Sequence, residues 1–201
     1  MQDPMHIPAS RSLILGSSSP YRRELLARLR LPFEVLAPEV EEAQKDAESP
    51  RQLACRLAMS KARAVAARRP QGVVIGSDQV ADLDGEAIGK PMNHARAVAQ
   101  LQRMRGRTVV FQTAVAVVCE ATGFAELDLA QVRVRFRALD DAEIERYLIR
   151  EQPYDCAGSA KSESLGIALL DSIESDDPTA LVGLPLIRTC RMLRAAGVQL
   201  L

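Results

Sequence analysis

Apolar residues recur along the chain with two different spacings, which predict alternating strands and helices. Short continuous apolar runs predict buried strands, at 12–16, 33–37 and 73–75. Apolar residues three and four positions apart predict helices, at 21–30, 50–69, 93–104, 140–150 and 186–196. Helix starts are marked by Ser19 followed by Pro20, by Asn93 as an N-cap, and by the capping-box pair Asp140 and Glu143.

The second half of the chain shows the two-residue period of strands. A hairpin is predicted over 80–88 around Asp84-Gly85, and strands over 108–118 and 127–136 are joined near Gly123. In the last strand, three apolar residues alternate with arginines: Val132, Val134 and Phe136 against Arg133, Arg135 and Arg137. We favour a sheet with one solvated face over an anion-binding role for these arginines.

This order of elements predicts the fold class. Strand–helix units come first and an antiparallel pair follows, which is typical of an α/β (mixed α+β) fold. We expect an elongated mixed β-sheet in two lobes, flanked by helices. We assign residues 1–10 to an N-terminal tail and residues 11–201 to a single domain.

Composition narrows the possible functions. Lys plus Arg and Asp plus Glu both number 26, aromatic residues make up 3%, and Trp is absent. A nucleic-acid-binding module would usually be basic, so this class is disfavoured. The four cysteines contain no C-x-x-C pair, and no apolar run reaches membrane-spanning length. We expect a cytoplasmic protein with reduced thiols and no membrane partner.

The first candidate site is the turn between the first strand and the first helix. Ser17, Ser19 and Arg22 place two hydroxyls and a guanidinium beside the free N–H groups of a helix start. This combination suits phosphate binding. An ordinary serine-capped helix with surface arginines fits the same residues equally well.

Two further positions carry chemistry beside the third apolar strand. Asp78 follows the run at 73–75, where open α/β sheets bind ligands, and a carboxylate there can bind Mg²⁺ or activate water. A turn aspartate bonded to its own loop is equally compatible. Lys61 lies on the apolar face of its helix; reaching out to water is the commoner behaviour, and facing an anion in a cleft is the alternative.

Two loops contain the remaining candidate residues for binding phosphate or metal. The segment Gly85–Pro91 differs from a Walker A loop by one residue of spacing and by its proline, so we reject that interpretation. Lys90 could still meet a phosphate. The acidic stretch with Glu39, Glu41 and Glu42 is usually only solvated, but one of these residues could join Asp78 at a metal.

Several motifs in order from about residue 12 to 187 resemble the Maf family of nucleoside triphosphate pyrophosphatases. They read L-I-L-G-S-S-S-P-Y-R-R-E-L-L, A-P-E-V-E-E, A-M-S-K-A, V-I-G-S-D-Q-V, D-G-E-A-I-G-K-P, C-A-G-S-A-K-S-E and V-G-L-P-L. The resemblance implies a cleft between the two lobes and a homodimer. It also implies metal-dependent hydrolysis between the α- and β-phosphates, with Mg²⁺ or Mn²⁺ as cofactor, giving a monophosphate and pyrophosphate.

The resemblance also implies roles for individual residues. Asp78 matches the general base, and Glu42 together with Asp78 matches a metal-binding pair. The phosphate-contacting positions are matched by Ser17, Ser19, Arg22, Lys61 and Lys90.

Three residues indicate the branch of the family. Tyr21, Gln79 and Glu163 resemble the branch that acts on 7-methyl-GTP, whose cationic base suits an aromatic face and a carboxylate. The alternatives are a dTTP or UTP pyrophosphatase of the same family, and a nucleotide-binding regulator of cell division.

Overall fold

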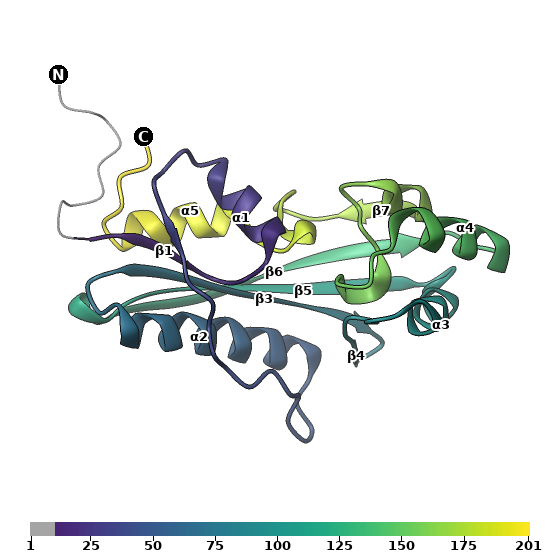
Figure 1. Cartoon of the computed structure of the whole chain (residues 1–201), viewed down its shortest axis with the longest axis horizontal. Coiled ribbons are helices and arrows are strands. Elements are labelled where there is room, and N and C mark those ends of the chain that lie inside the picture. The colour runs from purple at the N-terminus through teal and green to yellow at the C-terminus, as the bar shows by residue number, and fades with distance from the viewer. Residues whose placement is uncertain (1–10) are drawn as a thin grey trace.

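One mixed sheet organises the molecule. In the computed structural model, which describes residues 11–201, seven strands form this sheet in the order β2-β1-β3-β5-β6-β7, and β4 pairs with β3 (Figure 1). The strands are β1 (Leu13–Gly16), β2 (Glu34–Val35), β3 (Val73–Leu83), β4 (Glu86–Ile88), β5 (Thr108–Cys119), β6 (Phe124–Phe136) and β7 (Leu170–Glu174). β1 runs parallel to β2 and β3, and the remaining pairs are antiparallel. The predicted fold class is confirmed.

Helices divide the sheet into two lobes. They are α1 (Pro20–Ala27), α2 (Pro50–Arg68), α3 (His94–Met104), α4 (Asp141–Glu151) and α5 (Leu186–Ala195). At one end of the sheet, α2 covers one face while α1 and α5 cover the other; α3 and α4 lie at the opposite end (Figure 1). We call these ends the α2 lobe and the α3 lobe. The α2 lobe has an apolar cluster on each face of the sheet, and the α3 lobe has its own cluster.

The predicted helix starts are confirmed by their capping bonds. The Ser19 hydroxyl accepts a hydrogen bond from the backbone of Arg22, and Asn93 caps α3 in the same way. Asp140 and Glu143 form the reciprocal bonds of a capping box. Among the helices of residues 11–201, none is long and apolar enough to cross a membrane.

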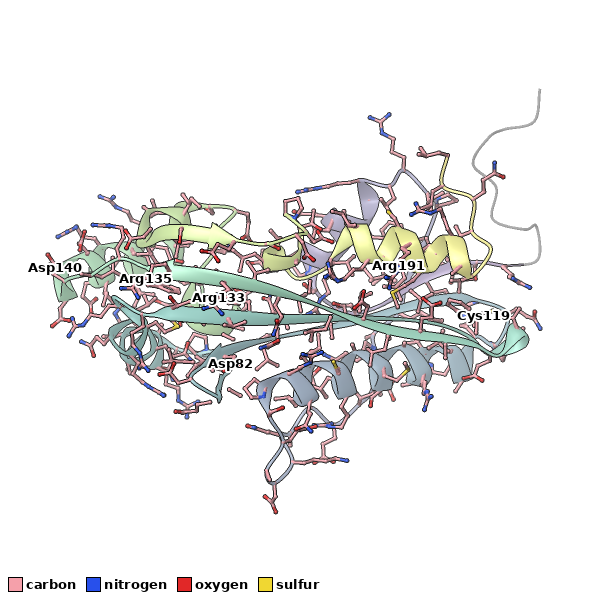
Figure 2. The ribbon with its side chains drawn as sticks, turned by 180° about the vertical axis from the view of Figure 1, so that it is seen from behind. Asp82, Cys119, Arg133, Arg135, Asp140 and Arg191 are labelled. Atoms are coloured by element: carbon pink, nitrogen blue, oxygen red, sulfur yellow. The ribbon has the colours of Figure 1, made fainter. Side chains whose placement is uncertain are left out.

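The alternation in β6 has the predicted structural meaning. Val132, Val134 and Phe136 are buried, whereas Arg133 and Arg135 are exposed. Figure 2 shows both arginines on the face of the sheet seen from behind. The favoured interpretation, a sheet with one solvated face, is therefore confirmed at this end of β6.

Two features of the sheet differ from the sequence prediction. The strand expected at 73–75 continues to Leu83, so Asp78 lies inside β3 and not beyond its end. Strand β3 pairs with β5 from Val74 to Asp82, and this ladder carries the strand through polar residues that interrupt the apolar run. Strand β7 was not predicted, because its exposed sequence has little apolar pattern and pairing with β6 forms it. The other boundaries differ by a few residues, and the predicted tail at 1–10 lies outside the described residues.

A glycine allows α2 to lie directly on β3. A Cβ atom on Gly76 would lie 2.4 Å from the carbonyl oxygen of Ala58 and 2.5 Å from the backbone nitrogen of Ala62. Both residues belong to the turn of α2 that carries Lys61. The bare backbone of Gly76 therefore sets how close Lys61 comes to the next residues of β3.

Candidate active site

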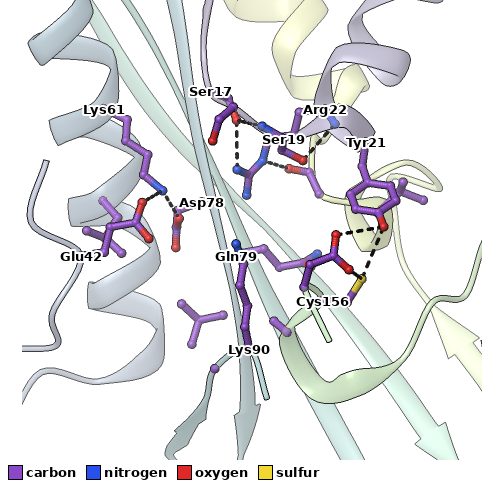
Figure 3. Close-up of a pocket in the computed structure, with 18 of the residues that line it drawn as sticks. Ser17, Ser19, Tyr21, Arg22, Glu42, Lys61, Asp78, Gln79, Lys90 and Cys156 are labelled. Atoms are coloured by element: carbon purple, nitrogen blue, oxygen red, sulfur yellow. Dashed lines mark hydrogen bonds and ion pairs between the residues drawn. The ribbon is translucent and has the colours of Figure 1, made fainter. Parts of the chain in front are cut away.

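The structure brings all the predicted site residues to one cleft. The cleft has a volume of about 510 Å³ and is lined from both lobes, by α1 and α2 on one side and by the loop after β4 on the other (Figure 3). The sequence-predicted residues that line it are Ser17, Ser19, Tyr21, Arg22, Glu42, Lys61, Asp78, Gln79, Lys90 and Glu163.

Lys61 lies between two carboxylates at the centre of this cleft. Its Nζ is 2.7 Å from Asp78 Oδ1 and 2.7 Å from Glu42 Oε1 (Figure 3). Lys61 is only 5% exposed and Asp78 only 8%, so most of this cluster is shielded from water. The expectation that Lys61 extends to solvent is therefore wrong. Lys61 instead faces into the cleft, as the alternative interpretation expected. Its ammonium is stabilised there by the buried carboxylate of Asp78.

Glu42 is the acidic-loop residue that reaches the cleft. Glu39 instead pairs with Arg68, at 3.9 Å. Burial raises the pKa of the Glu42 carboxyl, but the hydrogen bond and charge of Lys61, with the charges of Lys90 and Arg22, outweigh it. The net result is a lowered pKa, so this carboxylate stays ionised to more acidic pH than usual.

The donor set at this cluster fits a hard divalent cation. Glu42 and Asp78 offer carboxylate oxygens on either side of one ammonium. Within residues 11–201, no group of three or more His, Cys, Asp or Glu side chains is placed to hold a metal. Mg²⁺ commonly binds one or two carboxylates and completes its shell with water and substrate phosphates, so two protein ligands suffice.

The turn before α1 forms a compact polar cradle. Ser17 Oγ accepts hydrogen bonds from the backbone of Ser19 at 3.2 Å and from Arg22 Nη1 at 3.3 Å. Arg22 Nε donates to the carbonyl of Gly183 at 2.8 Å. Burial lowers the pKa of the Arg22 guanidinium, and the negative charges of Asp78 and Glu42 oppose that effect. The cradle thus offers a fixed guanidinium and the start of α1 to an anion.

Gln79 is held in a single amide orientation. Its Nε2 lies 3.0 Å from Thr113 Oγ1, 3.0 Å from the carbonyl of Ala180 and 2.9 Å from that of Leu181. Carbonyl oxygens only accept, so the amide cannot be flipped without opposing oxygen to oxygen. The sequence left Gln79 free to donate or accept; in the structure its N–H groups are committed and Oε1 is the atom left for a ligand.

Tyr21 belongs to a cluster that the sequence predicted only in part. Its hydroxyl donates to Asp155 Oδ2 at 3.2 Å, and Lys161 Nζ lies 5.3 Å from the ring centroid. Burial raises the pKa of Tyr21 to about 12 and that of the neighbouring Cys156 thiol to about 12. Asp155, Cys156 and Lys161 were not singled out, although the last two belong to the motif C-A-G-S-A-K-S-E.

The loop carrying Gly183 closes the site and was also missed. The Gly183 carbonyl accepts hydrogen bonds from Arg22 Nε and from Ser77 Oγ, the latter at 3.0 Å. Asp177 is fully buried at the base of this loop; it accepts hydrogen bonds from the Thr179 hydroxyl and from the backbone of Ile187 at the start of α5. The only sequence signal was the motif V-G-L-P-L, which contains Gly183.

Comparison with known proteins agrees with this architecture. Residues 12–196 match the family model described as Maf-like protein. A protein of Albidiferax ferrireducens named 7-methyl-GTP pyrophosphatase is 74% identical over 98% of this chain and 99% of its own length. Proteins of the same name from Polaromonas sp. and Aromatoleum aromaticum are 70% and 60% identical, over 96% and 94% of this chain and 88% and 97% of their own lengths. The family model and these relatives match almost the whole chain, and the family's motifs meet in one cleft. The chain therefore belongs to the Maf family.

Proposed function

We propose that this protein hydrolyses 7-methyl-GTP to 7-methyl-GMP and diphosphate, which removes a modified nucleotide from the pool. The observation that carries the proposal is the buried Lys61–Asp78 pair opposite the cradle of Ser17 and Arg22 in one cleft. The names of relatives 60–74% identical over nearly their whole length support the same reaction.

In this proposal Asp78 is the general base. Its carboxylate takes a proton from the water that attacks the α-phosphorus, and the bond to the bridging oxygen breaks so that diphosphate leaves. Lys61 orients Asp78 and offsets charge that develops on the phosphates. Ser17, Ser19, Arg22 and Lys90 bind the phosphate chain; Lys90 is exposed on the far wall of the cleft and can approach the phosphates from that side.

We assign the divalent cation, Mg²⁺ or Mn²⁺, to Glu42 and Asp78. When bound, it would supply positive charge to the triphosphate. The lowered pKa of Glu42 keeps its carboxylate ionised to more acidic pH than usual, and Lys61 holds this carboxylate close to that of Asp78, so the two residues that would hold the cation lie side by side.

Base recognition is assigned to Tyr21, Gln79 and Glu163. N7-methylation makes guanine cationic, and the Tyr21 ring attracts cations. With its nitrogen committed to the protein, Gln79 offers an acceptor to a base N–H. Glu163 is exposed in the cleft and can accept from the N1–H and N2–H₂ edge.

We also assign the protein a domain organisation, an oligomeric state and a compartment. Residues 11–201 act as one domain, because a single sheet runs through both lobes. The enzyme is a homodimer of the cytoplasm, where the four free thiols stay reduced. It does not bind nucleic acid, since its net charge is zero.

Diphosphate release from the purified protein tests this function. With Mg²⁺ or Mn²⁺, we expect 7-methyl-GTP to be turned over faster than GTP, UTP and dTTP, and Asp78→Asn to be the inactive control. Preference for UTP or dTTP would move the protein to the other branch of the family. Tight binding without turnover of any of the four would favour the regulator of cell division.

A further inference from the structure

The ammonium of Lys161 already contacts the ring of Tyr21, which is the aromatic side chain that the base is proposed to contact. Lys161 Nζ lies 5.3 Å from the centroid of the Tyr21 ring, within the range of a cation–π contact. Tyr21 lines the cleft, whereas Lys161 lies outside the set of described residues that line it. A base in the cleft would therefore meet a ring that is already bound to an ammonium from another side.

The main chain of Lys161 is fixed, so this contact is built into the fold. Its N–H donates to the hydroxyl of Tyr147 at 3.1 Å. Gly166 packs against it so closely that a Cβ atom there would lie 2.4 Å from the Lys161 carbonyl oxygen. The Lys161 side chain is 22% exposed, and its ammonium lies 3.5 Å from Glu151 Oε1. The other carboxylate oxygen of Glu151 accepts a hydrogen bond from the Ser164 hydroxyl, which holds the carboxylate beside Lys161.

The charge of Lys161 affects a cationic base and a neutral base differently. The π-electrons of one tyrosine ring attract a first cation more strongly than a second, and the two cations also repel each other across the ring. Neutral guanine experiences neither effect to the same degree. The product 7-methyl-GMP keeps the cationic base, so a weaker hold on it favours product release.

We propose that Lys161 is a specificity-determining residue that acts through Tyr21 and lowers the preference of the site for a cationic over a neutral base. This inference rests on the proposed function, in which the base lies against Tyr21. Glu151 moderates the effect because it screens the ammonium. Lys161 thus sets how strongly the enzyme separates methylated from unmethylated guanine nucleotides.

Calorimetric binding of 7-methyl-GMP and GMP to the full chain tests the proposal without relying on turnover. In Lys161→Met, which keeps the length of the side chain, we expect the affinity ratio of 7-methyl-GMP to GMP to rise about three- to tenfold, as expected for one unit charge at this range. Lys161→Arg keeps the cation and should stay within about twofold of the wild type. Lys45→Met removes an exposed lysine elsewhere and should leave the ratio unchanged.

Two further variants separate a charge effect from a structural one. Glu151→Gln removes the screening carboxylate and should lower the ratio. In a Tyr21→Leu background, Lys161→Met should no longer change the ratio, because the ring that couples the two cations is gone. Equal loss of affinity for both nucleotides in Lys161→Met, or an unchanged ratio, would overturn the inference. Absence of 7-methyl-GTP turnover by the wild type would instead refute the proposed function, and the binding ratios would still be measurable.

Discussion

The ammonium of Lys61 lies 2.7 Å from Oδ1 of Asp78, in a part of the cleft where both side chains are buried. Lys61 comes from α2 and Asp78 from the middle of β3, and the close approach of α2 to Gly76 brings them together. This pair explains how a carboxylate in the middle of a strand can be held in place by a charged partner and aimed into the cleft.

Asp78→Asn should lower kcat by about two to four orders of magnitude, which is the usual contribution of a positioned base. The amide is nearly isosteric but cannot accept a proton from water. Lys61 retains Glu42 as a partner, so the fold should persist. Diphosphate release and circular dichroism check this, with exposed Asp46→Asn as the matched control. Near-normal turnover by Asp78→Asn would remove Asp78 as the base.

Lys61→Met should destabilise the protein by about 3 kcal/mol, since it leaves buried Asp78 without its counter-charge. It should also change the pH dependence of activity. Lys61 is the chief group that lowers the pKa of Glu42, so its loss raises that pKa. Because a carboxyl with a depressed pKa loses its charge only as pH falls through that value, the acidic limb of kcat/KM should move to higher pH. An unmoved acidic limb would show that Glu42 does not control it.

Gly76→Ala should cost about 1–3 kcal/mol of stability, because the new methyl group would collide with backbone atoms of Ala58 and Ala62. Separation of α2 from β3 would also displace Lys61 and reduce kcat. Gly89→Ala is the matched control: its Cβ would meet open space, and stability should change by less than about 0.5 kcal/mol. Urea denaturation compares the two; equal effects would contradict the close approach as the cause.

Gln79→Glu should destabilise the protein by about 1–3 kcal/mol, since the carbonyls of Ala180 and Leu181 lose their donor and face a carboxylate. That environment favours the protonated carboxyl, so the loss of stability should grow as pH rises. Thermal unfolding at several pH values tests this, with exposed Gln71→Glu as the control. A variant as stable as the wild type at neutral and alkaline pH would mean that the amide is not locked by these carbonyls.

Most of the fold could be predicted from local pattern. The helix over 50–69, the capping box at Asp140 and the alternation in β6 are local features, because spacing and capping act within a few residues. Strand β7 and the full length of β3 could not be predicted in this way. Both depend on hydrogen bonds to a partner strand distant in sequence, which leave no periodic signature in the segment itself.

The sequence by itself determined which residue types are available to the site and their order along the chain, and this was enough to identify the family. Only the tertiary structure decided which atoms meet. It placed Lys61 between Glu42 and Asp78, committed the Gln79 nitrogen to the protein, and set Lys161 over Tyr21. Side-chain charge and hydrogen-bonding capacity are properties of single residues. Burial, pairing and amide orientation arise when helices and loops from distant parts of the chain pack against one sheet.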